Sequence, residues 1–68
     1  MEEFIKRLKE LRKERKLTQL QLANATRISV SAISAWENNT RIPSALAIIT
    51  LAKFFDVTSD YLLGLSDI

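Results

Sequence analysis

The sequence contains no cysteine and no histidine, and its 68 residues include a single glycine and a single proline. The absence of cysteine excludes disulfides, and the absence of both residues excludes ordinary zinc sites and serine–histidine catalysis. No apolar run approaches the roughly 20 residues of a membrane span. The charged start, MEEFIKRLKE, is unlike a signal peptide. We therefore expect a cytoplasmic protein that is not an enzyme, makes no membrane contact and needs no metal or cofactor.

The composition is that of one small globular domain covering residues 1–68, with 47% hydrophobic and 26% charged residues. A domain of this size buries only about 60% of the surface that its unfolded chain exposes. No alternating strand pattern, internal repeat or linker interrupts the chain. We expect residues 64–68 to begin a tail or a linker.

The apolar periodicity is helical throughout. It predicts a first helix over about 2–15, another over about 44–55 behind Pro43, and a short one that follows Thr58 and ends at Gly64. With two more helices in the middle of the chain, the expected fold is all-α, a compact five-helix bundle.

The two middle helices lie within about residues 18–38. Thr18 can cap the first, and Gln21 can reach back to complete a capping box. Ser29 can cap the second in the same way. Two short capped helices with almost nothing between them predict a helix-turn-helix, and such helices need a platform to be stable.

Several motifs in order resemble the phage-repressor and Cro-like class of helix-turn-helix DNA-binding domains, whose fold is called lambda-repressor-like. They are LKELRKERKLTQLQLA, the Ile-Ser start and Ala-Trp-Glu end of the second motif helix, NNTRIPS and DVTSDYLLG. The resemblance covers about Ile5 to Gly64. It implies a transcriptional regulator that binds double-stranded DNA sequence-specifically, most simply a repressor on a palindromic operator.

The resemblance also implies a structural ion pair. Arg12 and Glu37 match an arginine and a glutamate that, in this class, tie the first helix to the end of the recognition helix. Trp36, beside Glu37, shares the inward face of Ile33 and is expected in the core. Two residues depart from the class: Arg27 stands where glycine is usual in the turn, and Thr26 precedes it at an apolar position.

For DNA, the class places the second motif helix in the major groove. Its outward, base-facing positions are Val30, Ser31, Ser34 and Ala35. These side chains are small, so we expect modest direct readout of bases, with some selectivity from DNA shape. The expected phosphate-facing residues are Gln19, Ser29, Asn38, Asn39, Thr40 and Arg41, with Arg27 and Lys16 as weaker candidates.

Seven of the ten basic residues fall within the first quarter of the chain. Acidic residues are interleaved among them, so the cluster can be a solvated helix face with internal pairs such as Glu10 and Lys13. It can equally form a basic rim that meets phosphates, because it leads directly into the motif. The sequence leaves both interpretations open.

The helix over about 44–55 is apolar nearly all round, which indicates burial on more than one side. Either the bundle covers it, or part of it forms a dimer surface with residues near the carboxyl end. The candidates for that surface are Leu46, Ile49, Phe54, Leu63, Leu65 and Ile68. The resemblance favours a symmetric homodimer. The alternative function is a protein-interaction module on the same fold, antitoxin-like or antirepressor.

Overall fold

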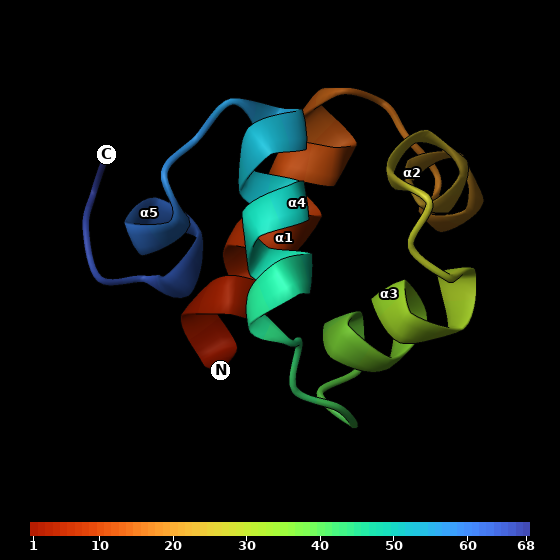
Figure 1. Cartoon of the computed structure of the whole chain (residues 1–68), viewed down its shortest axis with the longest axis horizontal. Coiled ribbons are helices and arrows are strands. Elements are labelled where there is room, and N and C mark those ends of the chain that lie inside the picture. The colour runs from red at the N-terminus through yellow and green to blue at the C-terminus, as the bar shows by residue number, and fades with distance from the viewer.

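The computed structural model describes residues 1–68 and confirms the all-α prediction. Its helices are α1 (Glu2–Glu14), α2 (Gln19–Thr26), α3 (Val30–Glu37), α4 (Ala45–Phe55) and α5 (Ser59–Leu63). The bundle measures 27 × 24 × 20 Å. In Figure 1, α4 lies in front of α1, with α2 and α3 on one side and α5 with the carboxyl end on the other. None of the helices combines the length and apolar character needed to cross a bilayer.

Local capping sets the starts of α2, α3, α4 and α5, and the caps of α2 and α3 are those that the sequence predicts. The Gln21 amide donates to Thr18 Oγ1 at 3.0 Å, and the Thr18 amide donates to Gln21 Oε1 at 2.9 Å, which completes the capping box. Ser29 Oγ accepts from the Ala32 amide at 3.1 Å. Ser44 and Thr58 cap α4 and α5 in the same manner. Each of these contacts spans three residues, so each is encoded locally.

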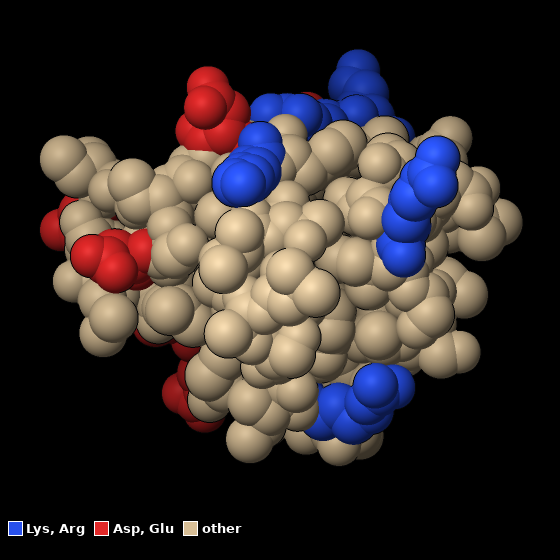
Figure 2. All heavy atoms as spheres, viewed as in Figure 1, with Lys and Arg blue, Asp and Glu red and all other residues tan.

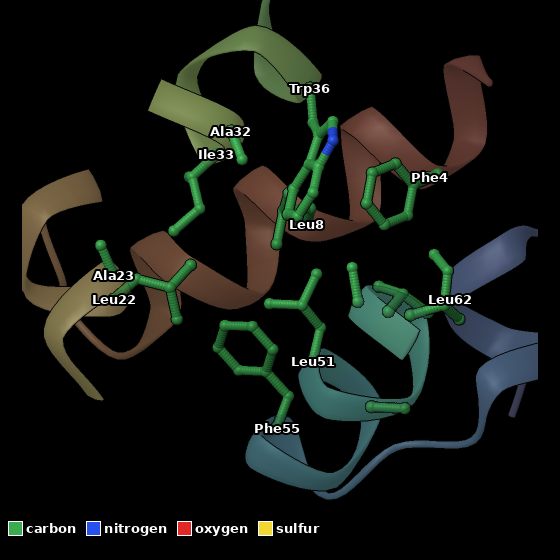
Figure 3. Packing of buried hydrophobic residues seen from close by; sticks show 13 residues of the cluster. Phe4, Leu8, Leu22, Ala23, Ala32, Ile33, Trp36, Leu51, Phe55 and Leu62 are labelled. Atoms are coloured by element: carbon green, nitrogen blue, oxygen red, sulfur yellow. The ribbon is translucent and has the colours of Figure 1, made fainter. Parts of the chain in front are cut away.

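One hydrophobic core of 13 buried residues draws on all five helices (Figure 3). Trp36 is only 4% exposed and meets the Phe4 ring edge-on, with 6.2 Å between centroids. Leu22, Leu51 and Leu62 bring α2, α4 and α5 to the same centre. The core therefore supplies the platform that the two short motif helices require.

The single glycine has a conformational and a steric role. Gly64 ends α5 with φ +83°, a region that side chains other than glycine seldom adopt. A Cβ atom at this position would lie 2.5 Å from Cβ of Glu3 on α1. Glycine therefore lets the end of α5 approach α1 closely and turns the chain into its last residues.

Candidate nucleic-acid interface

A buried ion pair fixes the motif on α1. Arg12 Nε donates to Glu37 Oε2 at 2.8 Å, and Arg12 Nη2 donates to Glu37 Oε1 at 2.9 Å. The third Arg12 donor, Nη1, reaches the Leu17 carbonyl oxygen at 2.8 Å. The Glu37 side chain is 4% exposed, and that of Arg12 is 12% exposed. This geometry joins the end of α3 to α1 and to the start of the motif.

Gln19 completes this network. Its Nε2 donates to Glu37 Oε1 at 3.1 Å, so the buried carboxylate accepts three hydrogen bonds. Burial alone would raise the pKa of Glu37, but the bonds from Arg12 and Gln19 and the charges of Arg12 and Lys9 outweigh it. The pKa of Glu37 consequently lies below its ordinary value, and the carboxylate stays charged. The expected phosphate-facing Gln19 is thus also a partner of Glu37.

The outward side of α3 presents two exposed positions and two partly covered ones. Val30 and Ser31 are exposed, and Ser34 and Ala35 are half-buried. Asn38 Nδ2 lies 3.4 Å from Ser34 Oγ, a long contact that leaves both groups accessible. This strip of the helix is small and uncharged, so a helix bearing it can approach another surface closely.

The loop after α3 is exposed throughout Asn38–Arg41. Thr40 closes the end of α3, because its amide donates to the Ala35 carbonyl oxygen at 2.8 Å and its Oγ1 donates to the same oxygen at 3.1 Å. Asn39 adopts the left-handed conformation, with φ 59°. The Thr40 hydroxyl hydrogen is therefore used within the helix end, whereas the Asn39 and Arg41 side chains are free.

The turn between α2 and α3 accommodates both departures from the family pattern. Arg27 has φ 61° and ψ 23°, which is left-handed and costs a residue other than glycine about 1 kcal/mol. Thr26 Oγ1 donates to the Leu22 carbonyl oxygen at 2.7 Å and accepts from the Ile28 amide at 3.4 Å. The Thr26 hydroxyl group, which stands at a position that is usually apolar, is therefore hydrogen-bonded. The Arg27 side chain is exposed.

Charge is distributed unevenly between the motif side and the rest of the molecule. From Arg15 to Phe55 the chain contains one carboxylate, Glu37, which is buried against Arg12. The exposed cations of this segment have no ion-pair partner and are Arg15, Lys16, Arg27, Arg41 and Lys53. In Figure 2 most acidic side chains lie in the left half of the face, the side of α5, whereas basic ones lie along the top and over the right half, the side of α2 and α3.

The three arginines among the basic residues in the first quarter of the chain all make tertiary contacts. Arg12 binds Glu37, and Arg7 donates to the carbonyl oxygens of Tyr61 and Ser66. Arg15 lies over the rings of Phe54 and Phe55. The roles of Arg7 and Arg15 could not be predicted from the sequence, because their partners lie 39 or more residues away. Only the Glu3–Arg7 spacing offered a local signal.

The six candidates for a dimer surface differ in their surroundings. Leu46 is 73% exposed and lines a groove beside the motif turn, whereas Ile49 and Leu63 line a second groove with Met1 and Pro43. The others lie elsewhere: Phe54 packs under Arg15, and Leu65 and Ile68 stand exposed on the last segment.

The known proteins that this chain resembles are all described as helix-turn-helix proteins. Residues 5–68 match the family described as helix-turn-helix domain. The chain is 39% identical over 64 residues to an uncharacterized HTH-type transcriptional regulator, YobD, of Bacillus subtilis (strain 168), covering 94% of this chain and 57% of that protein. It is 43% identical over 62 residues to the HTH-type transcriptional activator BcrR of Enterococcus faecalis, covering 91% and 30%.

A third relative is the uncharacterized HTH-type transcriptional regulator YqaE of Bacillus subtilis (strain 168), which is 38% identical over 60 residues and is covered to 52%. The chain therefore spans about half or less of the length of the curated relatives it matches. No solved structure matches it significantly.

Proposed function

The chain belongs to the helix-turn-helix domain family, and from this premise we propose that it is a transcriptional regulator that binds double-stranded DNA in a sequence-specific manner. Membership of this family points to a binding protein rather than to an enzyme. The relatives named as HTH-type transcriptional regulators and as a transcriptional activator support the proposal.

The observation that carries the proposal is the charge of the motif side. The one carboxylate between Arg15 and Phe55 is buried and paired, so every exposed charge in this segment is positive. Within this segment no exposed carboxylate repels a polyanion, and cations such as Lys16 and Arg41 can replace the counterions of DNA phosphates. The net charge of +2 alone would not have indicated this.

The small outer side of α3 suits the floor of the major groove. Val30 and Ala35 can contact thymine methyl groups, and Ser31 and Ser34 can hydrogen-bond to several bases. None of these side chains makes a bidentate pair with guanine or adenine, so each base pair should be discriminated by about 1 kcal/mol rather than about 3. DNA shape then supplies part of the selectivity.

The phosphate contacts in this arrangement flank α3. Gln19 at the start of α2 and Ser29 at the start of α3 lie at helix N-termini, and the loop Asn38–Arg41 follows the other end of α3. The Gln19 side-chain nitrogen donates one hydrogen to Glu37, and its second hydrogen can be donated to a phosphate oxygen. The Arg12–Glu37–Gln19 network would hold the two helix ends at a fixed separation, which suits a fixed spacing between phosphates.

We further propose that the protein is a repressor that binds a palindromic operator as a homodimer. The groove formed by α4, α5 and the amino end has a volume of about 370 Å³ and is lined mainly by apolar residues, including Ile49 and Leu63. A twofold dimer on a palindromic operator requires its two copies of α3 to enter successive major grooves, about 34 Å apart.

Selection of bound sequences from random duplex DNA tests the proposal. We expect a consensus with two symmetric half-sites. Ser31→Gln should sharpen a preference for adenine at one position in each half-site, because glutamine can pair bidentately with adenine. A consensus that is unchanged by substitutions at Val30, Ser31, Ser34 and Ala35 alike would show that α3 does not read the major groove.

Loss of a phosphate contact should change DNA binding in a different way from loss of a base contact. Arg41→Ala should weaken binding to all sequences alike and flatten the salt dependence by about one released counterion. Lys6→Ala removes an exposed cation from α1 and serves as the matched control with little effect. Weak binding that is insensitive to salt, together with a stoichiometric protein partner, would favour the antitoxin-like or antirepressor module instead.

A further inference from the structure

The solvent side of α4 differs in composition from that of α1. Every exposed residue of α1 is charged, and these residues are Glu2, Glu3, Lys6, Glu10, Lys13 and Glu14. The exposed residues of α4 are mostly apolar, namely Ala45, Leu46 and Ile49, with Lys53 as the one charged residue. Because the solvent side of a helix in a globular domain is normally polar, this side of α4 is typical of a surface that another element covers.

A groove runs along one flank of this surface, between the first half of α4 and the turn that joins α2 to α3. It is called here the turn groove and has a volume of about 300 Å³. Its lining residues are Thr26, Arg27, Ile28, Trp36, Ser44, Leu46, Ala47 and Thr50, of which Leu46 is 73% exposed. None of them lines the groove that contains Ile49 and Leu63, so the turn groove is separate from the proposed dimer surface.

The lining of the turn groove offers one charged group. Arg27 is exposed and forms no ion pair within the chain. The hydroxyl groups of Thr26 and Thr50 donate to carbonyl oxygens of their own helices, at 2.7 and 2.9 Å. The Arg27 guanidinium is therefore the charged donor of the groove. Its planar geometry suits a carboxylate, with which it can form two parallel hydrogen bonds.

Positive charge continues beyond the groove. Lys53 is exposed one turn after Thr50 on α4 and likewise forms no ion pair. The one carboxylate between Arg15 and Phe55, Glu37, is buried. Most of the surface over α4 is uncharged (Figure 2). The groove and its surroundings therefore favour a partner that combines apolar side chains with carboxylates, and they repel one that carries cations.

The architecture indicates the backbone conformation of this partner. The protein has five helices and no strand, so an extended segment finds no sheet edge to which its backbone can hydrogen-bond. A helix can pack alongside α4, because helices pack by placing rows of side chains into the grooves beside other rows. Leu46, Thr50 and Lys53 follow one another at intervals of four and three residues, which is the spacing of such a row.

We propose that the turn groove binds an acidic amphipathic helix of a partner protein. The apolar side chains of that helix pack against Leu46, Ile28 and Trp36. One of its carboxylates pairs with the Arg27 guanidinium, and another lies near Lys53. The contact involves no DNA, so it stands or fails independently of the proposed function.

The probe is a labelled synthetic peptide of about 18 residues, which is long enough to form a helix. Its leucines are three and four residues apart, and glutamates stand on both sides of them. Two matched peptides carry glutamine or lysine in place of the glutamates. Fluorescence anisotropy of each peptide would be measured against the full chain without DNA. We expect the glutamate peptide to bind about tenfold more tightly than the glutamine peptide, and the lysine peptide to bind most weakly.

Substitutions in the groove separate its apolar part from its charge. Leu46→Glu should weaken binding of the glutamate peptide by about tenfold, because it places a carboxylate on the apolar surface. Arg27→Glu should reverse the preference, so that the lysine peptide binds more tightly than the glutamate peptide. In the parent chain, the glutamate peptide should shift the amide resonances of Ile28, Leu46 and Thr50 most.

Matched controls make the same changes outside the groove. Leu20→Glu on α2 replaces another exposed leucine, and Lys6→Glu on α1 reverses another exposed cation. Both should leave binding of the glutamate peptide within about twofold of the parent, because salt screens exposed charges beyond about 8 Å. Circular dichroism would verify that all variants are folded and that the peptides are equally helical.

The peptides themselves can overturn the proposal in three ways. The first is equal binding of all three, or no binding at millimolar concentration. The second is a set of resonance shifts confined to residues outside the groove. The third is binding that is unchanged in both Leu46→Glu and Arg27→Glu.

Another occupant of the groove would give a different result, which would also overturn the proposal. If a second copy fills it, sedimentation equilibrium shows a dimer that Leu46→Glu dissociates and the glutamate peptide does not. If a membrane covers it, the chain binds vesicles containing phosphatidylglycerol through Leu46 and does not bind the peptides. If DNA covers it, Arg27→Glu weakens binding to duplex DNA and leaves peptide binding unchanged.

Discussion

Arg7 and Arg12 lie five residues apart on α1 and connect this helix to different regions of the molecule, through different kinds of acceptor. Arg12 binds a buried carboxylate with two donors and a carbonyl oxygen with the third, and it faces the motif. Arg7 faces α5 and the last segment of the chain, Gly64–Ile68, called here the tail. There it donates to two carbonyl oxygens and stacks 4.3 Å from the Tyr61 ring centroid. Its carboxylate neighbours, Glu3 and Asp67, are largely exposed.

The difference separates a rigid region from an adaptable one. Removing either partner of the Arg12–Glu37 pair leaves a buried charge without compensation, so the motif geometry depends on the pair being complete. The two hydrogen-bond acceptors of Arg7 are uncharged carbonyl oxygens, so removing Arg7 strands no buried charge. We therefore expect changes at Arg12 to act on the whole fold and changes at Arg7 to act mainly on the tail.

The largest expected effect is that of Arg12→Ala. It should lower the free energy of unfolding by about 3 kcal/mol or more, because it leaves Glu37 buried and unpaired. Denaturant melts of Arg12→Ala, Glu37→Ala and the double variant measure the coupling. If the losses of the two single variants add up to that of the double variant, the pair contributes no coupling energy. Arg12 would then not stabilise the fold through Glu37, and its expected difference from Arg7 would be wrong.

Acid should break the same pair without a mutation. The pKa of Glu37 in the folded state lies below its ordinary value of 4.5, so the pair contributes stability above about pH 4.5 that is lost as pH falls through the folded pKa. The loss should be smaller than in Arg12→Ala, because a protonated carboxyl still accepts hydrogen bonds. Melts between pH 7 and pH 2 should show this dependence in the wild type and a weaker one in Glu37→Gln.

On the tail side, Gly64→Ala tests the close approach of α5 to α1. The added Cβ meets Glu3 and adopts a strained φ, so we expect a loss of about 2 kcal/mol. Arg27→Gly is the converse control on the motif side, since it relieves a left-handed residue and should change stability by about 1 kcal/mol or less. A neutral Gly64→Ala would show that the junction adjusts freely.

Among the disruptive substitutions, Arg7→Ala should have the smallest effect, a loss of about 1–2 kcal/mol. Hydrogen exchange should locate it: the amides of Leu65 and Ile68 should lose protection, whereas that of Leu22 in the core should change only with global stability. Lys6→Ala, at the neighbouring exposed position, is the control. A uniform loss of protection in Arg7→Ala would show that Arg7, like Arg12, stabilises the whole fold, and would contradict the expected difference between the two arginines.

Short-range patterns in the sequence determined the helices and their limits. The caps at Thr18, Ser29 and Thr58 and the stop at Gly64 depend on residues within a few positions, so periodicity and cap chemistry were enough to place them. The Arg12–Glu37 pair spans 25 residues, and its prediction came from family resemblance rather than from spacing.

Only the tertiary structure assigned the remaining long-range contacts. It placed Gln19 against Glu37 and gave Arg7 partners 54 and 59 residues away. Such contacts depend on how helices cross once a shared core forms, and a pattern with a period of 3.6 residues holds no information on which helix covers which face. The sequence thus determined what each helix is, and the packing of the bundle decided which side chains meet.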